Sequence, residues 1–157
     1  MRVAIALLLI STFTFAVEVQ IVAKKVFADE KALKSRLSDN VVIKKGDDIL
    51  VADTVTIDFN KDKEPLKYEA QGSVSANVTI DDKRYHASGS ILTYDVAPNK
   101  YTLKGNAFLE ELNTSRKVYG DIITIDQNNG TYAVDGGTEP VKFIFQIDDA
   151  KSKEANK

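Results

Sequence analysis

Apolar and polar residues alternate along most of this chain, which is the pattern of half-buried β-strands. In the segment that begins at Val51, the alternation places Val51, Val55 and Ile57 on one face and the threonines between them on the other. The same two-residue period recurs at 17–23, 74–80, 101–103 and 141–147. These stretches are predicted to be strands with one apolar face.

Clusters of turn-forming residues separate the alternating stretches. They lie at 45–47, 60–63, 81–83, 98–100, 113–115, 128–130 and 135–137. Many short strands joined by tight turns predict an all-β sandwich, barrel or solenoid. Only 28–37 is ambiguous, because Leu33 and Leu37 stand at helical spacing. We expect a strand or loop there, since the repeat described next requires a strand leading into Asp39.

A short phrase repeats along the chain. Asp39-Asn40-Val41, Gly72-Ser73-Val74, Gly105-Asn106-Ala107 and Gly136-Gly137-Thr138 begin 33, 33 and 31 residues apart. A period in this range is typical of stacked supersecondary units that share one core. Glycine is expected at the head of the phrase, because the chain must bend or bulge there. Asp39 replaces it in the first copy and tolerates left-handed backbone better than most residues.

A second phrase closes each unit, and it ends in an apolar residue followed by Asp. Its three copies are 53–58, 90–95 and 121–126, which end at Asp58, Asp95 and Asp126. One repeat is therefore predicted to be a strand, a hairpin, a second strand that ends in Asp, and a turn into the next copy.

The first 16 residues have the features of a secretory signal peptide. Arg2 gives a positive start, an apolar run extends to Phe15, and Thr14-Phe15-Ala16 fits the small-x-small cleavage rule. The run is shorter than the ~20 residues that cross a bilayer, so we expect cleavage after Ala16; an uncleaved anchor is the alternative. We divide the chain into a signal peptide at 1–16, a β-domain at 17–147 and a charged, flexible tail at 148–157.

The composition argues against several classes of function. The 21 basic and 23 acidic residues are spread along the chain, which leaves no basic footprint for nucleic acid. There is no Cys and a single His, His86, so neither a nucleophile–base pair nor a His-rich metal site is expected. We therefore expect no enzyme active site, no cofactor and no metal.

The spacing of residues around both phrases follows a known pattern. It comprises Phe27-Ala28-Asp29, Leu37-x-Asp39-Asn40-Val41-x-Ile43, Leu50-x-Ala52-Asp53-x-Val55-x-Ile57 and Tyr68-x-Ala70-x-Gly72-x-Val74. Tyr101-x-Leu103-x-Gly105-Asn106-Ala107-Phe108-Leu109 and Val118-Tyr119-Gly120-Asp121-x-Ile123 continue it. Across about 19–147, the chain resembles the OstA-like family of periplasmic lipopolysaccharide-transport proteins. Asp39, in place of the usual glycine, is the departure from the pattern.

The resemblance implies a twisted, partly open β-jellyroll in which two antiparallel sheets face each other as a V. It implies that lipopolysaccharide binds by its lipid A part, whose acyl chains lie in the groove between the sheets. It also implies that protomers pair edge to edge as head-to-tail homo-oligomers. These would form a bridge between LptC-like inner-membrane proteins and LptD-like outer-membrane proteins.

A sandwich that is not fully closed offers an apolar slot for lipid tails. The alternating apolar positions suited to line it are Val41, Ile43, Val55, Ile57, Val74, Val78, Ile80, Leu92, Tyr94, Leu103, Leu109, Ile123, Ile125, Tyr132, Val134, Phe143 and Phe145. For each of them, simple packing in the core is the alternative. Lys24, Lys25, Lys34, Arg36 and Lys67 are candidates to meet lipid phosphates at the mouth of the slot, with a solvated surface role as the alternative.

An open jellyroll also has exposed edge strands, which pair with other chains unless they are blocked. The assembly edges are predicted to include Val19, Ile21, Val141, Phe143 and Phe145. Alternatively, Lys24-Lys25 and Asp148-Asp149 act as gatekeepers against such pairing.

Together, these features predict a periplasmic protein that carries lipopolysaccharide from the inner to the outer membrane. Two alternatives stay open: a membrane-anchored LptC-like partner of the same pathway, and a ligand-free structural or adhesive β-repeat module.

Overall fold

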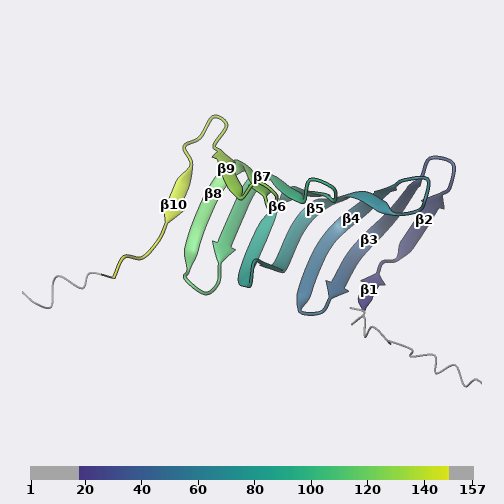
Figure 1. Ribbon diagram of the computed structural model, residues 1–157, viewed down its shortest axis with the longest axis horizontal. Coiled ribbons are helices and arrows are strands. Elements are labelled where there is room, and N and C mark those ends of the chain that lie inside the picture. Colours follow the sequence, from purple (N-terminus) through teal and green to yellow (C-terminus); the bar gives the residue numbers. More distant parts are fainter. Residues whose placement is uncertain (1–17, 149–157) are drawn as a thin grey trace, which may run out of the picture.

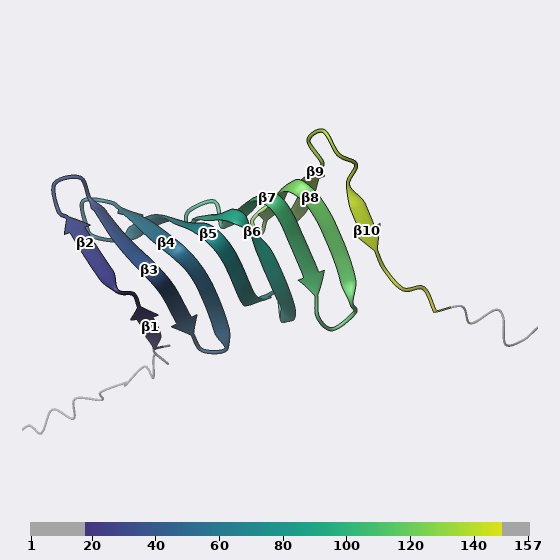
Figure 2. The same cartoon turned by 180° about the vertical axis from the view of Figure 1, so that it is seen from behind.

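The computed structural model describes residues 18–148, which form a single antiparallel sheet of ten strands (Figure 1). The strands are β1 (Val19–Val22), β2 (Lys25–Asp29), β3 (Lys34–Lys45), β4 (Asp48–Phe59), β5 (Pro65–Ile80), β6 (Lys83–Asp95), β7 (Lys100–Glu111), β8 (Arg116–Asp126), β9 (Thr131–Asp135) and β10 (Lys142–Ile144). Strands β3 to β8 pair in sequence order, β1 and β2 both pair with β3, and β9 and β10 both pair with β8. The two ends of the sheet therefore lie at opposite ends of the molecule (Figures 1 and 2). The all-β prediction is confirmed.

The sheet folds along a line that crosses each long strand near its middle. The pairing register shifts at this line, for example between Ser38 and Val41 in β3 and between Lys104 and Ala107 in β7. We call the side with β2, β9 and one half of each long strand leaf A. The side with β1, β10 and the other halves is leaf B. The two facing sheets expected from the resemblance are thus the two leaves of one continuous sheet.

At the fold line, two residues in left-handed conformation oppose a single residue of the next strand. The pairs are Asp39 and Asn40 (φ 65° and 57°), Gly72 and Ser73 (81° and 46°), and Gly105 and Asn106 (78° and 47°). They oppose Asp53, Ser90 and Asp121, respectively. The repeated phrase supplies the pairs and the closing phrase supplies the opposing residues, so both phrases meet at the fold line.

Glycine is required at two of these positions for two separate reasons. The positive φ of Gly72 and Gly105 disfavours any side chain. In addition, a Cβ atom on Gly105 would lie 2.6 Å from the Oγ atom of Ser90, and one on Gly72 would collide with the carboxylate of Asp53.

The first bend forms with Asp39 in place of glycine. Asp39 adopts φ 65°, its carbonyl accepts a hydrogen bond from the Lys24 amide at 3.1 Å, and its Oδ2 atom lies 3.2 Å from the Nζ atom of Lys25. Both contacts come from the short segment where β1 ends and β2 begins, so the bend and the edge strand hold each other in place.

A ladder of alternating charges crosses the outer face of leaf A, at the strand ends away from the fold line. Its register neighbours, in order, are Asp29, Lys34, Asp58, Lys67, Asp95, Lys100 and Asp126. The Nζ atom of Lys34 lies 3.2 Å from Oδ1 of Asp58. Opposite charges that face each other across strands stabilise pairing by roughly 0.2–1 kcal/mol each, so the ladder supports one register. This gives the closing Asp of each repeat a structural role.

Two expectations about strands were wrong in part. Val51 is exposed, whereas Leu50 and Ala52 face inward, because the alternation changes by one residue where the pairing register shifts between Val51 and Thr54. The last strand spans only Lys142–Ile144 rather than 141–147. Residues 28–37 contain a strand end, a turn and the start of β3, as expected. The predicted signal peptide and nearly all of the predicted tail lie outside the described residues.

We predict that Gly105→Ala lowers the free energy of unfolding by about 2–3 kcal/mol, through left-handed strain and overlap with Ser90. Gly46→Ala is the matched control, because Gly46 has φ 57° but no atom within 4 Å of the added Cβ; it should cost about 1 kcal/mol. Adding Ser90→Gly to Gly105→Ala should recover part of the loss. Equal losses at both glycines in urea titrations would contradict the role of the bend.

Candidate functional site

The inner face of the folded sheet is an apolar wedge whose two walls meet at the fold line. Small residues, among them Ala52 and Ala107, lie at the line itself and are almost fully buried. The leaf-A wall carries a continuous row of register neighbours: Val26, Leu37, Val55, Ala70, Leu92, Leu103, Ile123 and Val134. The matching row on leaf B is Ile21, Ile43, Leu50, Ala76, Ala87, Leu109, Val118 and Phe143. The two rows run from one end of the molecule to the other.

All of the predicted lining residues except Tyr94 fall into three groups by exposure. Val41, Val55, Ile57, Val74, Ile80, Leu103, Leu109, Ile123 and Ile125 are buried in one of two apolar clusters. Ile43, Val78, Leu92 and Val134 are partly exposed and pack against these clusters. Tyr132, Phe143 and Phe145 are more than half exposed. Core packing and groove lining both fit the buried group, so its lipid-binding role stays a prediction.

Tyr94 belongs to a row of tyrosines near the open rim of leaf A. Its ring stacks at 4.4 Å on Tyr101 and at 6.3 Å on Tyr68, and its hydroxyl donates to Asn99 Oδ1 at 3.1 Å. Burial raises the pKa of Tyr101 to about 12, with smaller contributions from Tyr94 and Asp48. The rim of the groove is therefore aromatic but carries polar hydroxyl groups.

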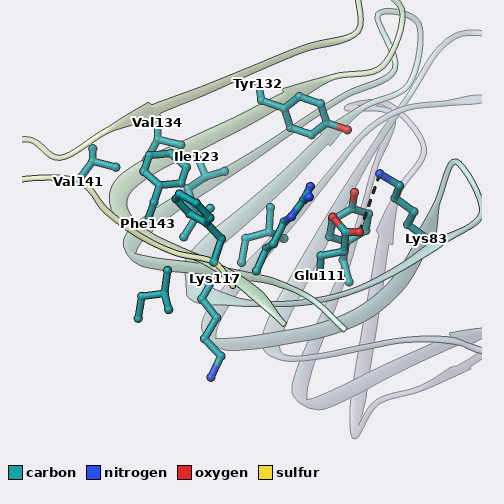
Figure 3. A pocket seen from close by; sticks show the side chains of 14 residues that line it. Lys83, Glu111, Lys117, Ile123, Tyr132, Val134, Val141 and Phe143 are labelled. Atoms are coloured by element: carbon teal, nitrogen blue, oxygen red, sulfur yellow. Dashed lines mark ion pairs between the residues drawn. The ribbon is translucent and has the colours of Figure 1, made fainter. Parts of the chain in front are cut away.

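A cavity of about 640 Å³ lies at the C-terminal end of the groove (Figure 3). Ile123, Val134 and Phe143 are among its apolar lining residues, and Lys83, Glu111 and Arg116 are among its charged ones. In Figure 3, Ile123 and Val134 of leaf A lie near Phe143 of leaf B, and Lys83 and Glu111 of leaf B lie together on another side of the cavity. We call this cavity the C-terminal pocket.

Charged and hydroxyl groups occupy one side of the C-terminal pocket. Among residues 18–148, Glu111 is the only buried charged residue, with 8% of its surface exposed. Its Oε1 atom lies 3.9 Å from the Nζ atom of Lys83. Burial raises the pKa of Tyr85 to about 12, and the neighbouring Tyr132 and Glu111 add to the shift. The pocket thus combines an apolar interior with ionic groups at its edge.

Four of the five basic residues considered for the mouth of the slot lie on the outer side of their strands, which fits the alternative of a solvated surface role. Lys34 and Lys67 point to the outer face, where they pair with Asp58 and Glu69 at 3.2 and 3.8 Å. Lys25 pairs with Asp39, and Arg36 occupies the outer side of β3, opposite Phe27. Because strand sides alternate, a basic residue near the rim in sequence can belong to either face. The basic side chains on the inner side of the pocket are instead Lys83 and Arg116, whereas Lys117, at its edge, turns outward and pairs with Glu110.

Sequence reasoning missed two kinds of lining residue. Alanines such as Ala70 and Ala87 are buried in the walls, but their side chains are too small to stand out in an alternation pattern. Glu111 was missed because a charged residue near a turn is normally expected to be exposed to solvent. Its position in the Ala107-x-Leu109-x-Glu111 alternation was the available signal.

Exposed apolar side chains gather at the two ends of the sheet. Ten of the fourteen large exposed hydrophobic residues of the described chain lie there. They are Val19, Ile21, Val22, Val26 and Phe27 at one end, and Tyr132, Phe143, Ile144, Phe145 and Ile147 at the other. Val141 is partly exposed and lines the C-terminal pocket. Apolar surface concentrated on unpaired edges marks interaction sites.

Residues 18–148 contain no group of three or more side chains arranged to hold a metal ion. Within the same part of the chain, no helix is long and apolar enough to cross a membrane. His86 lies on the outer face, where its Nδ1 atom is 2.9 Å from Asn77 Oδ1 and its ring meets Phe108 edge-on.

The folded sheet and its end-to-end apolar inner face define a partly open β-jellyroll with a groove suited to apolar ligands. Residues 20–131 match the family model described as "LptA/(LptD N-terminal domain) LPS transport protein". Because the match spans more than half of the chain, the protein belongs to this family of lipopolysaccharide-transport proteins. The resemblance to the OstA-like family is confirmed.

A comparison with solved structures supports the fold assignment. The crystal structure of LptH, described as the LptA homologous periplasmic component of the conserved lipopolysaccharide transport device from Pseudomonas aeruginosa, superimposes with a TM-score of 0.70. The two chains are 18% identical, and the match covers 83% of this chain and 96% of LptH. At this identity the likeness establishes the fold alone. A comparison with curated protein sequences found no match.

The raised pKa values of Tyr85 and Tyr101 predict a loss of stability at high pH. The unfolded chain releases these protons near pH 10, whereas the folded protein holds them to about pH 12. The free energy of unfolding should therefore fall as the pH rises from about 10 towards 12. Replacing both tyrosines with Phe should flatten this slope in denaturant titrations; an unchanged slope would contradict burial of the two hydroxyls.

Proposed function

We propose that this protein is a periplasmic carrier that holds the acyl chains of lipopolysaccharide between leaves A and B. The C-terminal pocket carries the proposal, because it joins apolar walls to the basic side chains of Lys83 and Arg116. A phosphorylated lipid requires both features: a dry slot for its tails and charge-assisted hydrogen bonds for its phosphate. Membership of the lipopolysaccharide-transport family supports the same conclusion.

The groove solves a solvation problem for the lipid. Exposing each CH₂ group to water costs roughly 0.8 kcal/mol, so several acyl chains cannot cross an aqueous compartment unshielded. The two apolar rows provide lining along the whole molecule, and the open ends allow a lipid to enter at one end and leave at the other. In this proposal the protein shields and passes on its cargo without catalysing a reaction.

Export and domain division form part of the proposal. Residues 1–16 act as a cleaved signal peptide, residues 17–147 form the periplasmic domain, and residues 148–157 form a charged tail. The apolar run and the small-x-small motif at Thr14-Phe15-Ala16 support this division.

Head-to-tail assembly follows from extending the rows of the sheet into a second copy. Continuing the leaf-B row beyond Phe143 brings it to Ile21 of the next protomer. Continuing the leaf-A row beyond Val134 brings it to Val26. In both leaves the meeting strands run antiparallel and turn apolar side chains to the same inner face. The groove therefore continues across the junction.

The same edges are proposed to contact the membrane components of the pathway. A protomer whose β1 and β2 edge is unpaired offers it to an LptC-like inner-membrane protein. The β9 and β10 edge of the last protomer offers itself to an LptD-like outer-membrane protein. Exposed apolar residues on both edges support this arrangement.

Introducing a negative charge on the inner wall of the groove tests whether lipid binds there. Val134→Asp should raise the dissociation constant for lipopolysaccharide roughly tenfold or more, because it places a carboxylate against acyl chains. Ala133→Asp is the matched control, since Ala133 is exposed on the opposite side of β9. The measurement is displacement of a fluorescent lipid A analogue, with thermal unfolding of each variant recorded in parallel. Equal dissociation constants for lipopolysaccharide in the two variants would contradict the proposal.

Engineered cysteines test the junction in a chain that has no Cys of its own. Ile21→Cys combined with Phe143→Cys should form disulfide-linked oligomers on oxidation, because directly opposed antiparallel residues lie about 4.5–5.5 Å apart. Ile21→Cys combined with Ile144→Cys is the control, since Ile144 occupies the other side of β10. Cross-linking of both pairs to the same extent, read on non-reducing gels, would contradict the proposed register.

A further inference from the structure

Glu111 distinguishes the C-terminal pocket from the remainder of the groove. It lies on β7 among apolar lining residues such as Leu109 and Ile123, with 8% of its surface exposed. A carboxylate in such surroundings is unfavourable unless a cation both neutralises it and donates hydrogen bonds to it. Its presence on the wall of a lipid groove therefore calls for a partner.

The chain itself supplies only a loose counter-charge. The Nζ atom of Lys83 lies 3.9 Å from the carboxylate, beyond hydrogen-bonding distance, and 53% of the Lys83 side chain is exposed. Arg116 is the register neighbour of Glu111 on β8, but among the ion pairs of the described residues Glu111 joins Lys83 and not Arg116. The carboxylate thus retains capacity for a closer cation.

Both signs of charge are therefore present beside one apolar cavity. The guanidinium of Arg116 and the ammonium of Lys83 can bind phosphate oxygens, with Arg116 in a bidentate geometry. A primary ammonium can donate up to three hydrogen bonds, and Glu111 has oxygens to accept them. A head group with phosphate alone would satisfy the basic residues but would bring a second negative charge towards Glu111.

We propose that Glu111 is a specificity residue of the groove, and that the C-terminal pocket selects amphiphiles whose head group joins a phosphate to a primary ammonium. The chemical class is the phosphoethanolamine group. It occurs as a substituent on lipid A and as the head of phosphatidylethanolamine, and the pocket recognises the chemistry that both share. This inference rests on the proposed function, because it assigns a head group to the same groove.

The test compares three ligands on two variants of the purified protein. The ligands are lipid A with unsubstituted phosphates, lipid A bearing phosphoethanolamine, and phosphatidylethanolamine, each presented in the same detergent. Glu111→Gln keeps the size of the side chain and removes its charge. Glu110→Gln is the matched control, because Glu110 is the next residue on the same strand and faces outward, where it pairs with Lys117.

The wild-type protein should bind the substituted lipid A more tightly than the unsubstituted one. Glu111→Gln should weaken binding of both ammonium-bearing ligands roughly tenfold, the effect of losing one charge-assisted hydrogen bond. It should tighten binding of unsubstituted lipid A, because the negative charge near the phosphate is removed. A loss confined to substituted lipid A also supports the inference and identifies lipid A as the source of the group.

Two results would overturn the inference. Equal changes for all three ligands in Glu111→Gln, or the same pattern in Glu110→Gln, would show that Glu111 does not read the head group. If either result is found and the wild-type protein still binds unsubstituted lipid A, only this inference is overturned, and the proposed function is retained. A wild-type protein that binds none of the three ligands overturns the proposed function and this inference together.

Discussion

The opposition of two left-handed residues to one residue on the neighbouring strand is the constraint on which this structure depends. Left-handed backbone costs a non-glycine residue roughly 1–2 kcal/mol, and the chain accepts that cost at Asn40, Ser73 and Asn106. The extra residue bends β3, β5 and β7 at the same level, so the bends align into one fold line across the sheet. Without them the sheet would continue flat, and the apolar rows on its two halves would have no opposing wall.

The two faces of the sheet have separate tasks. The outer face of leaf A supports the register through the alternating charges that include Lys34 and Asp58. The inner face is apolar and divided into two clusters, and Leu92 packs against both of them. A core organised in this way along the molecule, and open at both ends, can continue into a neighbouring copy without losing its lining.

The sequence predicted the bends and the all-β class because both depend on local chemistry. Gly72 and Gly105 are needed where φ is positive, and the repeat period places them in successive copies. The face taken by Val51 could not be predicted, since one extra residue at a bulge reverses the alternation. The burial of Glu111 and the outward direction of Lys34 depend on which strands pair, and this is long-range information that periodicity does not contain.

Site-specific photo-crosslinking tests most directly whether the groove between the leaves holds the lipid. A photoreactive phenylalanine analogue replaces an aromatic residue at Tyr94 or Tyr132 on the inner face, or at Tyr119 on the outer face of leaf B. Crosslinks to lipopolysaccharide should form from Tyr94 and Tyr132 and not from Tyr119. Equal labelling from both faces, or labelling from Tyr119 alone, would contradict the groove as the lipid site.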